Sequence, residues 1–156
     1  MRYADLLRTA YLLTGSPDAA EELVQSCLLK AMVRWDQIDD PMAYLRRAMV
    51  NDRVSRWRRL RRELLRPDPP DVVVPDATTP VAERAVVLAA LRRLPAQMRA
   101  VLVLRYWEDL SEAETARLLN CAVGTVKSQA SRGLARLRTA LDGSESSTVA
   151  TEGERR

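Results

Sequence analysis

The chain has 156 residues, of which 47% are hydrophobic, so its length allows one or two small domains with compact cores. It contains no histidine, which excludes Ser-His-Asp and Cys-His catalysis, histidine-ligated metals and histidine-based pH switches. The net charge of +4 is concentrated in two basic blocks, +7 over residues 46–66 and +5 over residues 81–141, with acidic segments between and around them. Two separated basic blocks favour two polyanion-binding surfaces, the alternative being solvated arginine-rich helix faces.

Three helices are predicted in the first part of the chain. Residues 3–13 place apolar side chains at helical spacing, and Gly15 ends this helix. Ser16-Pro17 starts a second helix, whose apolar stripe includes Cys27 and reaches Met32. Asp39-Asp40-Pro41 starts a third helix, which carries the arginine-rich block. We therefore expect a helical unit over residues 1–65.

Five of the eight prolines fall between residues 67 and 80, where no helix can continue. We expect a linker over residues 66–80, a second helical unit over residues 81–141 and a disordered tail over residues 142–156. The second unit is predicted to hold helices at 81–94, 99–107 and 124–141, and a short helix opened by a capping box at Ser111–Glu114. The expected fold is all-α, with two small helical domains joined by a proline-rich linker.

Residues 110–132 fit a helix-turn-helix. Ala116 is small where two helices would cross, and Asn120 suits the left-handed backbone that a tight turn needs. Val123 and Val126 are expected to be buried contacts of the second helix. Its other side carries small polar and basic residues that suit the major groove of DNA, namely Lys127, Ser128, Ser131 and Arg132. The alternative is a helix-turn-helix shape used only for packing.

The arginine-rich third helix has a different character. It combines arginines with Asn51 and Ser55, which lie one turn apart, and with Tyr44 and Trp57 toward its two ends. Aromatic and amide side chains suit unstacked single-stranded bases better than a closed duplex. The alternative for Tyr44 and Trp57 is a place in the hydrophobic core.

Successive motifs resemble the signatures of extracytoplasmic-function (ECF) sigma factors of bacterial RNA polymerase, and of an actinobacterial branch in particular. The motifs are LLTG at 12–15, DAAEELVQ at 18–25, YLRR with a following Asn at 44–51, the segment 91–111 and GTVKS at 124–128. The resemblance implies a sigma region 2 bundle over residues 1–65 and a region 4 helix-turn-helix over residues 81–141. Met1 falls where the family is already inside the first helix, so either the start lies upstream or this helix is shortened.

The same resemblance implies roles for individual residues. Binding to a coiled coil on the polymerase β′ subunit would involve Glu22, Leu23 and Gln25. Capture of the −10 element, with Asn51 as the best candidate for a flipped base, would involve Tyr44, Arg47, Asn51, Ser55 and Arg58. Contact with the −35 element would involve Thr125, Lys127, Ser128, Ser131 and Arg132. The implied partners are core RNA polymerase, through the β′ coiled coil and the β flap, promoter DNA and an anti-sigma factor.

The implied function is transcription initiation, with promoter recognition and melting of the −10 element. Binding energy for unpaired bases shifts the opening equilibrium, so we expect no cofactor, no metal and no enzymatic activity. A stand-alone helix-turn-helix regulator is the main alternative, but it leaves the third helix unused. An all-α interaction protein or small enzyme is the second alternative, and no catalytic motif supports it. With two cysteines outside any CxxC motif and no membrane span or signal peptide, we expect a soluble cytoplasmic protein.

Overall fold

The computed structural model describes residues 2–64 and 80–152, and all regular elements in these ranges are helical. The N-terminal unit contains α1 (Arg2–Thr14), α2 (Pro17–Met32), the short 3-10 helix η1 (Trp35–Gln37) and α3 (Pro41–Leu64). The C-terminal unit contains α4 (Pro80–Arg92), α5 (Ala96–Leu102), the π-helical turn η2 (Val103–Trp107), α6 (Glu112–Leu119) and α7 (Val123–Glu152). The predicted all-α fold is confirmed. None of the described helices is long and apolar enough to cross a membrane.

Local signals set the helix ends as predicted. Gly15 takes a φ of +78° after α1, which a residue without Cβ adopts freely. Ser16 caps α2 by accepting a hydrogen bond from the Ala19 N–H, and the Asp40 carboxylate accepts from two N–H groups at the start of α3. Ser111 and Glu114 form the predicted reciprocal capping box of α6.

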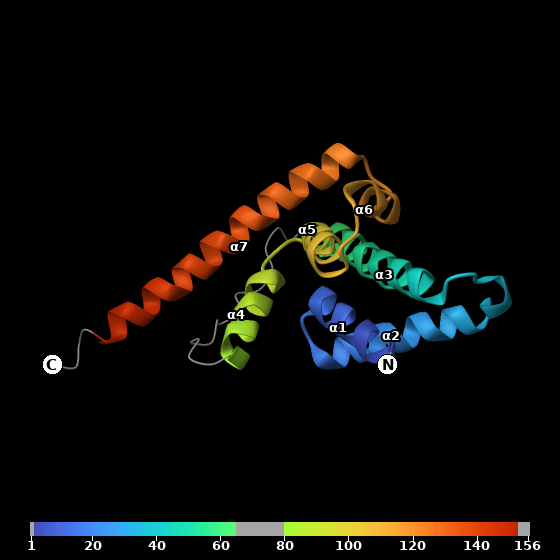
Figure 1. The fold of residues 1–156 in the computed structure, drawn as a ribbon, viewed down its shortest axis with the longest axis horizontal. Helices are drawn as coiled ribbons and strands as arrows, with labels where there is room; N and C mark the ends of the chain where they lie inside the picture. Colours follow the sequence, from blue (N-terminus) through green and yellow to red (C-terminus); the bar gives the residue numbers. More distant parts are fainter. Residues whose placement is uncertain (1, 65–79, 153–156) are drawn as a thin grey trace.

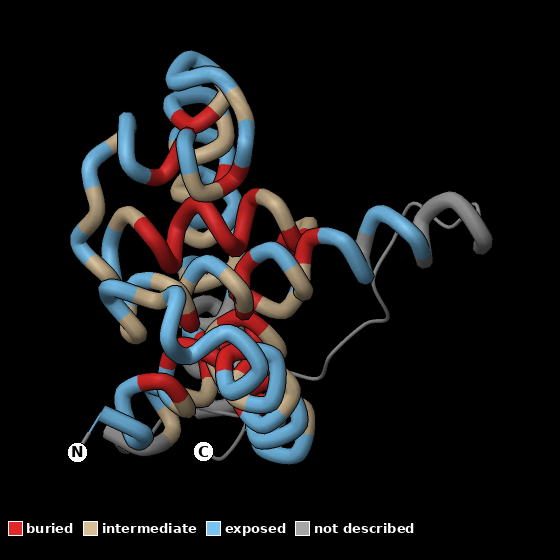
Figure 2. Tube along the Cα trace, turned by 90° about the vertical axis from the view of Figure 1, so that its right-hand side faces the viewer, coloured by how far each residue is buried: buried red, intermediate tan, exposed pale blue. Residues whose placement is uncertain are grey.

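The two units pack against each other in one body (Figure 1). α1, α2 and α3 form the N-terminal bundle, and α3 also contacts α5 and α6 of the C-terminal unit. One hydrophobic core runs through both units: it includes Leu13, Met49 and Val50 on one side and Val101 and Leu104 on the other. Buried segments accordingly meet in the middle of the molecule in Figure 2. Burial of apolar surface therefore stabilises the contact between the units.

Several sequence expectations about the ends of elements differ from the structure, and others lie outside the described residues. Three side chains predicted to be buried are exposed, namely Tyr3, Met32 and Val123, because each lies at the end of its helix, beyond the packed neighbours. The tail expected to be disordered from residue 142 continues α7 to Glu152, where no proline interrupts the helix. The linker at 66–79 and residues 153–156 lie outside the described residues, as does the side chain of Trp57.

Cys27 lies fully buried in this core, and its thiol is therefore expected to react slowly in the native chain. Burial raises the pKa of the Cys27 thiol to about 11, with Asp52 adding to the rise and Lys30 opposing it. Only about 0.1% of such a thiol is ionised at pH 8, and the thiolate is the nucleophile. We expect the aromatic disulfide dithiobis(nitrobenzoate) to modify the partly exposed Cys121 in the native chain and both cysteines in denaturant. Rapid modification of both thiols in the native chain would contradict the burial of Cys27.

Candidate nucleic-acid interface

α6, the turn after it and the start of α7 form the predicted helix-turn-helix. Asn120 ends α6 with φ and ψ of 52°, the left-handed conformation that reverses the chain within a few residues. Ala116 is buried where the two helices meet, and Val126 is fully buried on the inner side of α7. The backbone of Ala122 accepts hydrogen bonds from Thr125 and Val126, so the first turn of α7 closes without a side-chain cap.

The predicted −35 residues lie together on the outer side of α7. Lys127, Ser128, Ser131 and Arg132 are exposed, and Thr125 is partly buried beside them. The Lys127 ammonium is 3.7 Å from the Glu112 carboxylate, an exposed pair that contributes little to stability and that competing phosphates can replace. The Ser128 hydroxyl donates to the Gly124 carbonyl, which holds it against the helix. The helix therefore presents two cationic donors above small side chains that let it approach a groove closely.

The predicted −10 residues form one stripe along α3. Positions 44, 47, 51, 55 and 58 follow each other at three- or four-residue intervals, so they share a helix face. Arg47, Asn51, Ser55 and Arg58 are exposed, whereas Tyr44 is partly buried and packs against the core. Among the described residues, neither Arg47 nor Arg58 pairs with a carboxylate. The stripe thus offers an amide, a hydroxyl and two unneutralised guanidinium groups.

Three other arginines of the basic block on α3 make contacts with other groups of the protein. Arg46 Nε lies 2.6 Å from the Glu108 carboxylate, and Arg53 Nε donates to the Leu13 carbonyl at 3.2 Å. Arg56 pairs with Asp52 at 3.4 Å. Burial and the neighbouring Arg56 lower the pKa of Arg53, while Asp52 opposes them. Within the described part of this block, these three arginines and the exposed stripe therefore lie on different sides of α3.

Asp52 connects α3 to α2 through a small network of ion pairs. Its carboxylate lies 3.1 Å from the Lys30 ammonium and 3.4 Å from Arg56, and Arg56 in turn reaches Glu22 at 4.0 Å. Only 16% of the Asp52 side chain is exposed, so these charges are less screened than a surface pair. The network links α3 to α2, while the burial of Met49 and Val50 in the core leaves Asn51 on the outer side of the helix.

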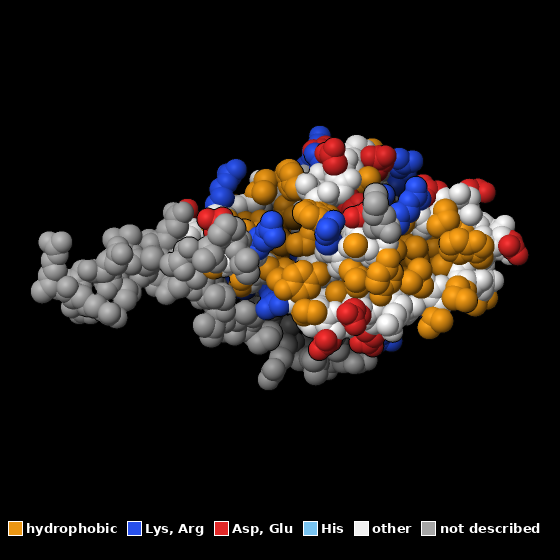
Figure 3. All heavy atoms as spheres, turned by 60° about the horizontal axis from the view of Figure 1, so that its bottom comes forward, with side chains coloured by type: hydrophobic (Ala, Val, Ile, Leu, Met, Phe, Trp, Pro, Cys, Tyr) orange, Lys and Arg blue, Asp and Glu red, His pale blue; other side chains and the backbone are white. Residues whose placement is uncertain are grey.

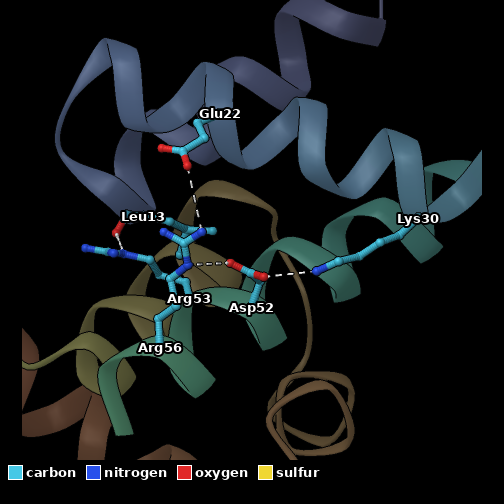
Figure 4. A network of polar contacts seen from close by, with 6 residues as sticks. All are labelled: Leu13, Glu22, Lys30, Asp52, Arg53 and Arg56. Atoms are coloured by element: carbon cyan, nitrogen blue, oxygen red, sulfur yellow. Dashed lines mark hydrogen bonds and ion pairs between the residues drawn. The ribbon is translucent and has the colours of Figure 1, made fainter. Parts of the chain in front are cut away.

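The predicted polymerase-binding residues on α2 differ in their exposure to solvent. Glu22 and Gln25 are exposed, whereas Leu23 is 6% exposed and packs in the core, so its contact with polymerase stays a prediction. The face of α2 that bears Glu22 and Gln25 continues to Leu29 and Met32, which are 65% and 70% exposed. Figure 3 shows hydrophobic side chains gathered over this end of the molecule, and Figure 4 shows Glu22 above the Asp52 network.

The sequence did not identify Leu29 and Met32 as candidate contact residues. An apolar helical pattern does not show where a helix extends beyond the helices that pack against it. Trp35 in η1 adds a third exposed hydrophobic side chain, with 53% of its surface accessible. Contiguous exposed apolar patches are typical of protein-binding surfaces, so these side chains make this face of α2 a candidate for one. No group of three or more potential metal ligands occurs among the described residues.

Known proteins with the same organisation identify the family. The Sigma-70 region 2 family matches residues 1–63, and the Sigma-70, region 4 family matches residues 84–137. The chain is 42% identical over 155 residues to the RNA polymerase sigma-E factor of Streptomyces avermitilis, which covers 97% of this chain and 87% of that relative. It is 33% identical over 144 residues to the ECF RNA polymerase sigma factor SigM of Mycobacterium tuberculosis, covering 89% and 72% of the two chains.

The fold agrees with these sequence relationships. The sigma factor RpoE of Bartonella quintana, solved in complex with the anti-sigma factor NepR, is similar to this chain with a TM-score of 0.70. The similarity covers 89% of this chain and 91% of RpoE at 28% identity. The chain belongs to the ECF family of RNA polymerase sigma factors.

Proposed function

We propose that this chain is a transcription initiation factor that binds core RNA polymerase and directs it to promoters. It contacts the −35 element as a closed duplex through α7 and the −10 element as a separated strand through α3. The observation that carries this proposal is the presence of two unlike recognition faces in one chain: small and basic side chains on α7, and an amide with arginines on α3. A stand-alone regulator of duplex DNA needs only the first face and is disfavoured by the family membership.

The chain supplies binding energy rather than catalysis. Asn51 and its neighbours favour unstacked bases, so they shift the promoter toward its open form without a cofactor. Polymerization then belongs to the core enzyme, and the proposed site of action is the cytoplasm. Since RpoE was solved with an anti-sigma factor, a protein of that class is a proposed regulator of this chain too.

The exposed face of α2 is the proposed docking site for the polymerase core. Replacement of Leu29 by aspartate is expected to weaken binding to core polymerase by about tenfold, because it places a charge at the centre of an apolar contact. Leu29 is largely exposed in the free chain, so the fold itself tolerates the change. The measurement is a fluorescence titration of labelled chain with purified core.

A matched control is Val87→Asp, which changes an exposed apolar side chain on α4 in the same way. It is expected to bind core like the unmodified chain. Equal affinity of both variants would remove the α2 face from the docking surface. Failure of the unmodified chain to bind core at all would overturn the proposed function.

Arg132 is the strongest candidate for base contact on α7. Its replacement by alanine is expected to reduce transcription from a cognate promoter by about tenfold or more, since a guanidinium on a guanine contributes about 1–3 kcal/mol of discrimination. Binding to core polymerase should not change. The control is Arg136→Ala, which removes an exposed arginine one turn further along α7. Equal losses in both variants would show a general charge effect instead of −35 recognition.

A further inference from the structure

Three arginines from different helices meet at the turn that follows α1. Arg53 of α3 and Arg99 of α5 both donate to the Leu13 carbonyl, at 3.2 and 3.0 Å. Arg92, the last residue of α4, lies over Gly15: a Cβ placed on that glycine would be 2.6 Å from both Cγ and Nε of the arginine. α3, α4 and α5 thus direct three positive charges to one turn of the backbone, and we call these three side chains the arginine cluster.

The charges of the cluster are close enough to affect one another. Burial lowers the pKa of Arg99, and the positive charges of Arg53 and Arg92 lower it further. Burial also lowers the pKa of Arg53, with Arg56 acting in the same direction and Asp52 opposing it. Like charges held together by the fold repel each other, so an anion that binds among them relieves this repulsion.

Arg99 contributes charge to the cluster rather than a contact for a ligand. It is 7% exposed, and each of its three guanidinium nitrogens donates to at least one backbone carbonyl. Its hydrogen-bonding groups are therefore committed to the ends of α1 and α4. The positive charge that they carry still adds to the potential at the neighbouring turn.

Arg53 and Arg92 have the donor groups that a ligand needs. Both are partly exposed, and Arg53 donates to the Leu13 carbonyl through Nε. In the described part of the chain, neither lies within ion-pair distance of a carboxylate, whereas Arg56 pairs with Asp52 at 3.4 Å. Figure 4 shows the Arg53 guanidinium beside the Leu13 carbonyl and pointing away from Asp52. The cluster therefore offers two guanidinium groups that no described carboxylate neutralises.

This arrangement suits a phosphate group with two negative charges. Guanidinium groups bind phosphate oxygens through pairs of N–H donors, and two such groups together carry a charge of +2. A phosphate monoester carries about −1.5 to −2 at pH 7, because its second pKa is about 6. A phosphodiester carries a single negative charge and so complements the cluster less well.

The position of the cluster separates it from the proposed path of the promoter strand. Asn51 and Arg53 are two residues apart, which is about 200° around a helix with about 3.6 residues per turn. Arg53 thus points to the side of α3 opposite the stripe of predicted −10 residues, toward the Leu13 carbonyl. A strand that follows the stripe does not pass the cluster, which favours a separate small molecule as the ligand.

We propose that the arginine cluster is a binding site for a small phosphorylated molecule, whose terminal phosphate is held by Arg53 and Arg92 beside the turn at Gly15. The ligand class is a phosphate monoester or a diphosphate, and both a free nucleotide and inorganic pyrophosphate carry such a group. The cluster lies outside the proposed DNA-binding and polymerase-binding residues. Ligand binding there is therefore independent of the proposed function.

Isothermal titration calorimetry of the full chain with inorganic pyrophosphate, at constant ionic strength, tests the site. We expect saturable binding at a single site with a dissociation constant of about 1 mM or lower. Dimethyl phosphate, a monoanionic diester, is expected to bind at least about tenfold more weakly. Titration with ADP distinguishes the two sources: tighter binding than that of pyrophosphate indicates a nucleotide, and equal binding indicates the phosphate group alone.

Two variants assign the binding to the cluster. Arg92→Gln and Arg53→Gln are each expected to weaken pyrophosphate binding by at least about tenfold, because each removes one of the two guanidinium groups. The glutamine at position 53 keeps an amide donor for the Leu13 carbonyl, and circular dichroism compares the helix content of all variants. The matched control is Arg84→Gln, which removes the same charge from an exposed position on α4 and should stay within about twofold of the unmodified chain.

Absence of saturable pyrophosphate binding would overturn the inference, as would equal weakening in Arg84→Gln and Arg92→Gln. A short single strand without terminal phosphates that displaces pyrophosphate would assign the cluster to a polynucleotide and would also overturn it. None of these results changes the expected binding to core polymerase, so the inference and the proposed function can fail separately.

Discussion

Replacement of Arg99 by methionine is expected to lower the free energy of unfolding by about 3–5 kcal/mol. Arg99 is 7% exposed, and its guanidinium donates to the carbonyl groups of Leu13, Leu91, Arg92 and Leu94 at 2.7–3.1 Å. These carbonyls lie at or just beyond the ends of α1 and α4. The Leu91 carbonyl also accepts from the Leu94 N–H, and the Leu13 carbonyl also accepts from Arg53. Methionine fills much of the same volume but removes a charged donor from all four carbonyls, of which Leu13 keeps Arg53 and Leu91 keeps the Leu94 N–H.

The charge of Arg99 persists at neutral pH and favours the same contacts. Burial lowers its pKa to about 10, and the positive charges of Arg53 and Arg92 act in the same direction. A guanidinium with that pKa remains protonated near pH 7, where it complements the negative ends of two helix dipoles. Removing it therefore removes both hydrogen bonds and a favourable charge.

Urea denaturation followed by far-UV circular dichroism measures the change in unfolding free energy. Arg136→Met, on the exposed side of α7, is the control and is expected to stay within about 0.5 kcal/mol of the unmodified chain. Arg99→Lys should recover only part of the loss, because an ammonium cannot reach all four acceptors. A midpoint for Arg99→Met equal to that of the control would contradict the role of Arg99.

Replacement of Asn51 by alanine is expected to reduce open-complex formation by about tenfold or more while leaving binding to core polymerase within about twofold. Asn51 is exposed at the middle of the α3 stripe, while its neighbours Met49 and Val50 are buried in the core. Its amide provides both donors and an acceptor, which match the edge of an unpaired base. Alanine keeps the helix and removes only those groups.

Permanganate modification of unpaired thymines measures the open complex directly, and a gel-shift titration measures closed binding. Gln97→Ala provides a control in which a side-chain amide is removed from α5, away from the stripe. It should give the full permanganate signal. An equal reduction in closed binding and in opening for Asn51→Ala would contradict a role confined to the separated strand.

The sequence predicted those features of the fold that depend on residues close together in the chain. The ends of α2, α3 and α6 follow from Ser16, Asp40 and the Ser111 capping box, because each cap bonds groups within three residues. The left-handed Asn120 could be predicted for the same reason. The exposed recognition sides of α3 and α7 follow from helical periodicity, which requires no knowledge of the neighbouring helices.

The sequence did not indicate which apolar residues of α2 are buried or which arginines are paired, because contacts between distant helices decide both. Leu23 and Met32 occur in the same apolar pattern of α2, yet one is buried and the other exposed, because α2 extends beyond the helices that pack on it. The engagement of Arg46 by Glu108 and of Leu13 by Arg99 depends on residues far along the chain. No local motif distinguishes these arginines from those that remain exposed.

The central claim is that this chain directs RNA polymerase to promoters through two different faces. In vitro transcription with purified core polymerase on a library of random DNA, followed by sequencing of transcript 5′ ends, tests it most directly. We expect discrete start sites that share two upstream elements, with Arg132→Ala relaxing sequence preference in the distal element and Asn51→Ala in the proximal one. Start sites identical to those of core polymerase without the chain would contradict the claim.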